Sequence, residues 1–409
     1  METIELWKAV EGGSVTSPLG FQAGGLHCGL KKTDRNDLGV ILCEVPAAAA
    51  AVYTTNVFQA APLLVTRDSL KDRRLRAVVV NSGNANACTG RQGEADAFAM
   101  RAQTAAAFGL AEADIAVAST GVIGENLPME KVSSGIAQLP SSTAYGAEGA
   151  EQFSQAILTT DLVKKTACVK LAIDGREVTI GGACKGSGMI HPNMATMLAF
   201  VTTDAEVDPA ALQSLLVDTT NVTFNMITVD GDTSTNDMLL VMASGLAGNR
   251  PLSADHPQWE QFAAAFRHVN ESLAKQIARD GEGATHLIEV QVKGGVTDAS
   301  AGAIAKTIVG SSLVKSAVFG ADANWGRIIA AAGRAGEPID PSNVDIKLGP
   351  IVTLEGSKPV AFDEEAALEY LKGDTVQIFV DLHGGEGEAT AWGCDLTYDY
   401  VRINAAYRT

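Results

Sequence analysis

The residues of this chain that could do chemistry gather around a threonine that follows a glycine-dense segment. Residues 181–193 are rich in glycine and end in Pro192-Asn193, and the apolar residues 194–201 behind them are typical of a central strand. Thr196 stands at the head of that strand. A threonine hydroxyl becomes a competent nucleophile when the α-amine of the same residue is free, because the amine can act as its base. Such an amine titrates near ~7.7–8.0, so part of it is neutral at physiological pH.

Because Thr196 is internal, this chemistry requires a cut between Ala195 and Thr196. The cut can be self-catalysed: the Thr196 hydroxyl attacks the Ala195 carbonyl, the acyl group shifts from nitrogen to oxygen, and water releases the ester. A strained, glycine-rich approach would favour that step by raising the ground state. The alternative is a mobile surface loop before a strand that contains an ordinary threonine. Composition does not decide between the two.

Other catalytic and binding motifs are incomplete. A phosphate-binding loop needs glycine before lysine, whereas Lys185 precedes Gly186, and no third glycine completes a dinucleotide fingerprint. Residues 230–235 lack the glycine and the later glutamate of a calcium loop. Neither HExxH nor Gly-x-Ser-x-Gly occurs. Isolated histidines such as His256 are expected to be solvated or packed.

The elements that must position Thr196 belong to a mixed α/β chain. With 409 residues the chain exceeds one ordinary core, so two lobes are expected. The basic residues 71–76 are interpreted as a solvated loop between two strands. Short Val- and Ile-rich segments predict buried strands at 40–42, 77–80, 115–118, 287–292 and 376–380, and amphipathic patterns predict helices at 95–108, 259–277, 302–309 and 364–371.

Composition excludes several classes of protein. The formal net charge of −17 opposes binding to nucleic acid or to anionic lipid, and no apolar stretch is long enough to span a membrane. The acidic N-terminal residues 1–13 argue against a targeting signal, so a cytoplasmic protein is expected. None of the six cysteines forms a CxxC pair, which indicates reduced, mostly buried thiols and no metal site.

Four stretches are similar to the ornithine acetyltransferase family, the bifunctional arginine-biosynthesis proteins also called glutamate N-acetyltransferases. The likeness runs nearly end to end in the correct order, without departure at the key positions. The stretches are Asn81–Gly90, Lys185–Leu198, Ile227–Asp237 and Gly320–Arg327.

The resemblance implies a fold, a maturation and a reaction. The fold is a layered sandwich of two β-sheets between helices, resembling the N-terminal-nucleophile hydrolases but with different connectivity. The precursor cleaves itself into an α chain, 1–195, and a β chain, 196–409, which form a heterotetramer of two α and two β chains. Thr196 takes the acetyl group from N2-acetylornithine and passes it to glutamate in a ping-pong reaction. No cofactor is implied. Family members differ in whether acetyl-CoA is a second acetyl donor, and the residues leave that open.

Further site residues follow from the same resemblance. Thr120 and Gly121 match the oxyanion site, where each donor facing the tetrahedral oxygen contributes ~3–4 kcal/mol. Without the family, this pair would be interpreted as a strand-ending turn. The positions that match substrate-contacting residues are Thr159, Lys185, Thr196, Glu282, Asn404 and Thr409.

Each substrate-binding assignment has a plainer alternative. Lys185 suits an α-carboxylate, although a lysine between glycines is usually exposed. Glu282 suits the ammonium of ornithine, although an acidic residue between glycines is usually a solvated turn. Asn404 and Thr409 belong to a tail that would ordinarily fray. The apolar residues 396–403 predict instead a strand-like segment that docks the tail.

Two rival functions remain. A self-cleaving threonine aminopeptidase or amidohydrolase would use the same nucleophile but admit water to its acyl intermediate. A non-enzymatic protein that uses residues 181–193 as a ligand loop would run as one uncleaved band near 42.5 kDa.

Overall fold

The computed structural model describes residues 6–191 and 197–405. These divide into two compact units, as the chain length predicts. The described residues of the first unit fall within Met1–Gly186, Asn193–Phe224 and Thr233–Leu273, and those of the second within Ser187–Pro192, Asn225–Asp232 and Ala274–Thr409. The units therefore interleave along the sequence and do not coincide with the expected α and β chains. The predicted fold class is confirmed: the chain is mixed α/β, with two sheets and flanking helices.

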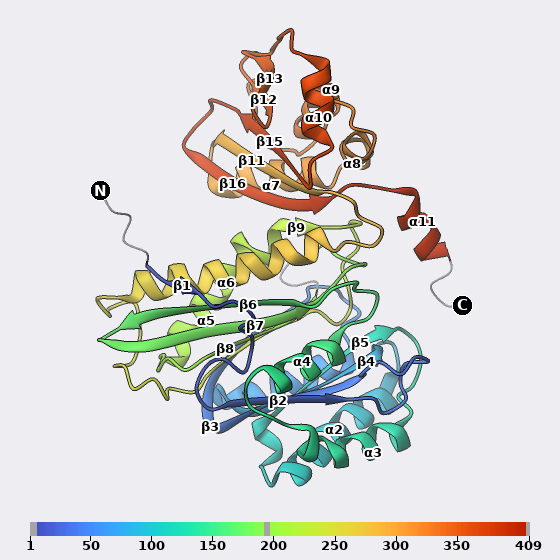
Figure 1. Cartoon of the computed structure of the whole chain (residues 1–409), viewed down its shortest axis with the longest axis vertical. Helices are drawn as coiled ribbons and strands as arrows, with labels where there is room; N and C mark the ends of the chain where they lie inside the picture. Colours follow the sequence, from blue (N-terminus) through green and yellow to red (C-terminus); the bar gives the residue numbers. More distant parts are fainter. Residues whose placement is uncertain (1–5, 192–196, 406–409) are drawn as a thin grey trace. The chain divides into compact units, whose positions relative to one another are not determined.

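A sheet of nine strands forms the frame of the first unit in the described part of the chain (Figure 1). Most pairs are antiparallel, but β4–β5 and β8–β10 are parallel. In sheet order the strands are β1 (Lys8–Ala9), β6 (Lys165–Ile173), β7 (Arg176–Lys185), β8 (Leu198–Thr203), β10 (Met238–Ala243), β3 (Leu38–Tyr53), β4 (Arg74–Asn84) and β5 (Ile115–Val122), with β2 (Phe21–Leu26) paired to β3.

Helices cover both faces of the β3–β4–β5 region. Alternation along β4 divides its side chains between two cores, with Val78 and Val80 on one face and Val79 on the other. The first core includes Phe153 of α4, and the second includes residues of α2 and α3, which lie on the opposite side of the sheet in Figure 1. The helices are α1 (Ala61–Ser69), α2 (Gly90–Phe108), α3 (Met129–Ser142), α4 (Gly146–Ile157) and α5 (Pro209–Val222), and α6 (Trp259–Arg279) begins in this unit.

β8 and β10 are the most deeply buried strands of this sheet. Every residue of both strands is buried, as expected for continuous apolar segments. Phe200 of β8 is fully buried and meets Phe153 edge to face, with ring centroids 5.4 Å apart. β8 thus holds the segment after Thr196 in the interior of the unit.

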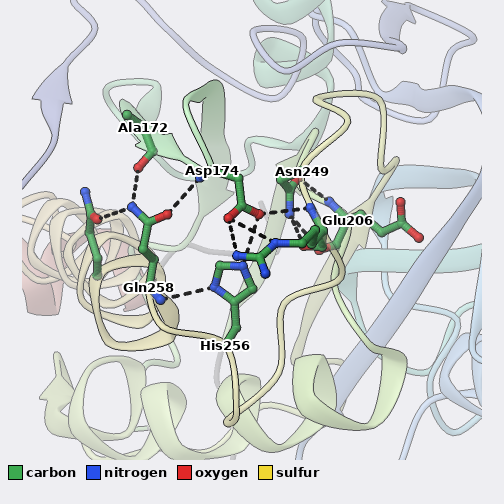
Figure 2. Close-up of polar contacts among 8 residues, drawn as sticks. Ala172, Asp174, Glu206, Asn249, His256 and Gln258 are labelled. Atoms are coloured by element: carbon green, nitrogen blue, oxygen red, sulfur yellow. Dashed lines mark hydrogen bonds and ion pairs between the residues drawn. The ribbon is translucent and has the colours of Figure 1, made fainter.

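The turn between β6 and β7 is held in place by side chains from the loop of residues 250–258 (Figure 2). Asp174 has a positive φ of 50°, and its carboxylate accepts from the Arg250 guanidinium (2.6 Å) and lies 3.1 Å from His256 Nε2. The Gln258 backbone N–H donates to His256 Nδ1, so the neutral ring carries its proton on Nε2 and donates it to Asp174. His256 is therefore packed and structural, in agreement with one of its two expected states.

The second unit is built on a sheet of seven strands among the residues described. Ile288, Val290 and Val292 of β11 point to one face and pack with Ile304 and Ile308 of α7. The strands in sheet order are β14 (Lys358–Pro359), β13 (Ile351–Glu355), β12 (Asp345–Leu348), β15 (Thr375–Asp381), β11 (Leu287–Gly295), β16 (Gly387–Cys394) and β9 (Ile227–Thr228). The helices are α7 (Asp298–Val309), α8 (Ser312–Phe319), α9 (Trp325–Gly333), α10 (Glu364–Leu371) and α11 (Tyr398–Ala405).

All the strands and helices predicted from periodicity are confirmed, whereas two other predictions and one alternative are wrong. Residues 396–403 are not strand-like but enter helix α11, because the Thr397 hydroxyl accepts from the Tyr400 N–H (3.4 Å) and starts a helical turn. Residues 181–185 are not loop but the end of β7. Residues 71–76 do not link two strands: a 3-10 turn (Leu70–Asp72) follows α1, and β4 begins at Arg74.

Close packing explains the glycines at the end of β7. A Cβ on Gly181 would lie 2.1 Å from the Ser14 carbonyl oxygen, and one on Gly182 would lie 2.8 Å from Leu273 Cδ1. These glycines let neighbouring segments approach the strand and do not indicate mobility.

Among the helices described, no single one is long and apolar enough to cross a membrane, although the bent pair α7 and α8 would pass together by length and composition.

Removing the buried ring of β8 should cost much of the unfolding free energy. Phe200→Ala deletes a fully buried side chain that the surrounding core cannot replace, so we expect a loss of about 3–5 kcal/mol. Phe58→Ala is the matched control, because Phe58 is 70% exposed and should change stability by less than about 0.5 kcal/mol. Urea unfolding measures both. Equal losses would contradict the placement of β8 in the core.

Candidate active site

The expected oxyanion residues lie at the end of β5. Thr120 is buried, and Gly121 adopts a φ of +137° where β4 and β5 lose their regular register. A Cβ on Gly121 would lie 2.2 Å from the Gly83 carbonyl carbon, so only glycine fits this close approach. The pair stays within the strand, which ends one residue later at Val122, and the alternative of a turn is not what the structure shows.

Lys185 lies beside Thr120 and is buried, not exposed. It is the last residue of β7 and pairs with Leu198, the first residue of β8. Its ammonium donates to the Thr120 hydroxyl oxygen over 3.4 Å. An ammonium has no acceptor, so the Thr120 hydroxyl proton remains available to donate to another group. The structure thus places a cation and a hydroxyl donor together near the start of β8.

Thr159 lies in the connection between α4 and β6, where Asp161 organises the chain. The Asp161 carboxylate accepts from the Thr159 N–H (3.0 Å), the Gly186 N–H (2.6 Å) and the Lys165 ammonium (2.7 Å). Burial by itself would raise the pKa of Asp161. The charges of Lys185 and Lys165, together with these hydrogen bonds, have the larger effect and lower it to about 2. Asp161 is therefore an ionised group in the interior that ties Thr159 to the end of β7.

Two more polar residues precede β10. Asn236 donates to the carbonyl oxygens of Ala85 (2.6 Å) and Ser119 (2.9 Å), which holds the strand end that carries Thr120. Asp237 is buried, and one of its carboxylate oxygens has no hydrogen-bond partner. Burial raises the pKa of Asp237 well above its ordinary value, and the Ser234 hydrogen bonds and the Lys185 charge only partly oppose this. Burial therefore favours the neutral form of this carboxyl group, which interacts with Lys185.

In the second unit, Glu282 meets Asn404. Glu282 is 7% exposed, so the alternative of a solvated turn is wrong. Its carboxylate accepts from the Asn404 side-chain amide (2.8 Å). Its backbone N–H donates to the Ser187 carbonyl oxygen (2.9 Å), which joins the glycine-rich segment to the Glu282 turn. A Cβ on Gly188 would lie 2.3 Å from the Glu282 carboxylate carbon, so glycine at this position makes room for Glu282.

The same unit holds the segment that leads toward the expected cleavage site. The Asp230 carboxylate accepts from the N–H groups of Met189 (2.7 Å) and Ile190 (2.9 Å). The Val229 N–H donates to the Ile190 carbonyl oxygen (2.7 Å), and His191 Nδ1 lies 2.9 Å from the Thr228 hydroxyl. Residues 187–191 are therefore ordered by the 228–230 segment, and the alternative of a mobile loop is wrong for them.

The predicted site residues thus fall into three groups. Thr120, Gly121, Thr159 and Lys185 belong to the first unit, and the structure brings Thr120 and Lys185 into contact. Glu282 and Asn404 belong to the second unit and contact each other. Ala195, Thr196 and Thr409 lie outside the described residues, so their assignments remain predictions.

Sequence reasoning missed four polar residues of these two groups. Asp230, Asn236 and Asp237 fall within the family-like stretch 227–237, and Asp161 lies two residues after Thr159, but no role was assigned to them. For the aspartates the signal was a carboxylate close to glycine- or threonine-rich segments, whose backbone N–H groups need acceptors. Asn236 gave no such signal, because its amide donates to two carbonyl oxygens. Among the residues described, no group of three or more His, Cys, Asp or Glu side chains could hold a metal ion, and none of the six cysteines forms a disulfide.

A methyl group at position 121 should destabilise the protein far more than one at position 124. Gly121→Ala adds a steric clash with the Gly83 backbone to an unfavourable φ, so we expect a loss of about 2–5 kcal/mol of unfolding free energy. Gly124→Ala is the matched control, since φ is +85° there but nothing lies within 4 Å of the added carbon. It should lose only about 1 kcal/mol. Chemical denaturation of both variants measures the difference, and equal losses would contradict the close approach.

Known proteins are similar to this chain along nearly its whole length. The profile of the ArgJ family matches residues 22–409. The arginine biosynthesis bifunctional protein ArgJ of Geobacillus kaustophilus is 62% identical over 402 residues, which cover 98% of this chain and 97% of that protein. The protein of the same name from Bacillus subtilis is 56% identical over 398 residues, 97% of each chain. A crystal structure of ArgJ from Bacillus halodurans matches with 62% identity and a TM-score of 0.51, covering 52% of this chain and 100% of the solved one. The chain therefore belongs to the ArgJ family.

Proposed function

We propose that this arginine-biosynthesis enzyme of the ArgJ family transfers the acetyl group of N2-acetylornithine to glutamate through an acetyl ester on Thr196. The observation that carries the proposal is the buried contact between Lys185 and Thr120. Lys185 pairs with Leu198, two residues after Thr196 in the sequence. A cation for a carboxylate and a donor for an oxyanion therefore accompany the strand that Thr196 precedes.

Maturation is proposed to come first and to create the base. The Thr196 hydroxyl attacks the Ala195 carbonyl carbon, the peptide nitrogen leaves as an amine, and an ester links Ala195 to Thr196. Water then hydrolyses this ester, which yields a carboxylate on Ala195 and restores the hydroxyl. The new α-amine of Thr196 can now accept the proton of that hydroxyl.

Transfer then takes two steps. In the first, the Thr196 oxygen attacks the acetyl carbonyl of N2-acetylornithine, its proton passes to the α-amine and on to the leaving nitrogen, and ornithine departs. In the second, the neutral α-amine of glutamate attacks the acetyl-threonine ester, and the Thr196 oxygen leaves and regains a proton. N-acetylglutamate is released, and no cofactor is consumed.

Thr120 is proposed to stabilise the negative oxygen of both tetrahedral intermediates. Its hydroxyl accepts from the Lys185 ammonium, which polarises the O–H bond and leaves its proton free to donate. Gly121 would supply a backbone N–H beside it, at a position where the absent side chain permits the close fit to Gly83. Such fixed donors act without reorganising during the reaction.

Charge complementarity suggests how the substrates are held. Lys185 is proposed to bind the α-carboxylate and Thr159 to line the same site. Glu282 is proposed to bind the ammonium of ornithine, and the Asn404 amide would orient its carboxylate through the 2.8 Å hydrogen bond. Thr409 is proposed to complete the binding site.

Strand order supports a mature enzyme whose two chains stay together. β8 and β10, which would belong to the β chain, lie between β7 and β3, which would belong to the α chain. Separating the chains would break one sheet in its buried centre. The solved relative also agrees in length, because 409 − 195 = 214 residues is 52% of this chain, the share that it covers. We propose a heterotetramer of two α and two β chains that acts in the cytoplasm.

A hydrolase with the same nucleophile is the competing proposal. It would release acetate from N2-acetylornithine in the absence of glutamate, whereas a transferase consumes this donor only when the acceptor amine is present. Lys185 and Glu282 suit the carboxylate and ammonium of this donor in both proposals, so the requirement for glutamate is what separates them.

Cleavage is the first test of the nucleophile. Purified protein should separate into chains of 195 and 214 residues (409 − 195 = 214), the larger beginning Thr-Met-Leu-Ala. Thr196→Ala should remain full-length and inactive, while Thr196→Ser keeps a hydroxyl and should still be cut. Intact mass and N-terminal sequencing measure the products. Efficient cutting of Thr196→Ala at the same bond would refute the assignment.

The acetyl-enzyme is the second test. Mature enzyme incubated with N2-acetylornithine alone should carry one acetyl ester on Thr196, and glutamate should discharge it to N-acetylglutamate. Initial rates with both substrates varied should give parallel lines, and the rate should fall at low pH as the Thr196 amine is protonated. Peptide mass spectrometry locates the ester, and repeating the loading with acetyl-CoA tests the second donor. Intersecting lines without an adduct would indicate direct transfer instead.

A further inference from the structure

Asp161 is a buried carboxylate outside the residues that the proposed reaction uses. It is 3% exposed and lies between Thr159 and the end of β7. One oxygen, Oδ1, accepts from the Lys165 ammonium (2.7 Å) and from the Gly186 N–H (2.6 Å). The other, Oδ2, accepts from the Thr159 N–H (3.0 Å). A single side chain therefore fixes the backbone at two places next to proposed substrate contacts.

Two lysines share this one carboxylate, but unequally. Lys165 is fully buried and forms the ion pair with Asp161. Lys185 is close enough for its charge to lower the pKa of Asp161, yet among the residues described its ammonium has no carboxylate within ion-pair distance. Its hydrogen bond goes to the Thr120 hydroxyl. The cluster of Asp161, Lys165 and Lys185 consequently keeps one positive charge that no described side chain neutralises.

Two other titratable groups face Lys185 from neighbouring elements. Lys31, in the segment after β2, interacts with Lys185, Asp161 and Asp37; burial lowers its pKa to about 8, although Asp37 opposes the shift. Asp237 lies directly before β10, and its raised pKa favours the neutral acid. Lys31 is itself a base, and Asp237 forms no ion pair with Lys185 among the residues described. A buried cation that no carboxylate of the described residues pairs with is costly, so it marks a place where an anionic group of a ligand is stabilised.

We propose that Asp161 is a positioning residue of the substrate site, which orders Thr159 and Gly186 and pairs with Lys165 so that the charge of Lys185 is kept for the α-carboxylate of the substrate. This inference rests on the proposed function, because it takes an amino-acid carboxylate as the ligand of Lys185. It assigns to Asp161 the selection of substrates that carry this carboxylate over analogues that lack it.

Asp161→Asn is the sharpest test. The amide keeps the shape, but it removes the negative charge beside Lys165 and Lys185, and its NH2 group cannot accept a hydrogen bond from a backbone N–H as the carboxylate does. The variant should therefore hold Thr159 and Gly186 less firmly and bind the substrate carboxylate more weakly. We expect the KM for N2-acetylornithine to rise about tenfold relative to that of the unchanged enzyme at the same pH.

Substrate choice gives a second readout. N-acetylputrescine is N2-acetylornithine without its carboxylate, so the preference for N2-acetylornithine, as a ratio of kcat/KM, should fall in Asp161→Asn by about tenfold. Lys165→Met is the complementary variant, and it serves if Asp161→Asn does not mature. It frees Asp161 to pair with Lys185, and the KM for N2-acetylornithine should rise about tenfold.

Asp204→Asn is the matched control. Asp204 is also buried and also accepts two backbone N–H groups, those of Thr179 (2.7 Å) and Leu19 (3.0 Å), but it lies at the other end of β7 and β8. It should lose stability without a change in KM or in substrate preference. If Asp161→Asn or Lys165→Met behaves like Asp204→Asn, the positioning role is refuted. If the unchanged enzyme does not turn over N2-acetylornithine with glutamate, the proposed function fails instead.

Discussion

β8 pairs antiparallel with β7 and parallel with β10, and each of its six residues is buried. This pairing determines where the polypeptide can present Thr196, because the strand that follows it cannot shift without breaking two ladders of hydrogen bonds. A one-residue slip would also turn Phe200 away from Phe153 and reverse every side chain of the strand. The pairing brings Leu198 level with Lys185 of β7 and with Met238 of β10. The pairing also decides which polar residues lie beside these strand ends, namely Asp161 and Asp237.

The same strand ends concentrate charge in the interior of the first unit. Burying Lys165, Lys185 and Asp161 costs free energy that a wholly apolar core would not lose. The charges of Lys185 and Lys165 hold Asp161 in its ionised state, and the hydrogen bonds from Thr159 and Gly186 offset a further part of this cost. A protein that retains such a cluster at the edge of its most apolar strands gains a fixed electrostatic environment, which an acyl-transfer reaction with charged amino-acid substrates requires.

In the second unit, two acidic residues order the backbone of a glycine-rich segment. Asp230 and Glu282 both act on the glycine-rich segment 187–191, the first by accepting from its backbone N–H groups and the second through its own N–H and its contact with Gly188. Burial, followed by the carboxylates of Asp230 and Glu282, raises the pKa of Tyr400, whose phenol therefore stays protonated beside them. The glycines of this segment thus serve close packing, which agrees with a backbone held in place before the expected cleavage site.

Much of the local structure was determined by the sequence alone. Continuous apolar segments predicted β8 and the strands at 77–80 and 115–118, and Gly109, with a φ of 65°, ends helix α2 as its position predicts. The oxyanion and substrate residues Thr120, Lys185 and Glu282 were predicted by resemblance, but their burial was not, since a lysine or glutamate between glycines is ordinarily exposed. Tertiary structure alone decided that Asp161 reaches Gly186, 25 residues away, and that Asn236 reaches Ser119, 117 residues away. The physical reason is that periodicity and capping act over a few residues, whereas a buried carboxylate or amide takes whichever partners the sheet brings beside it.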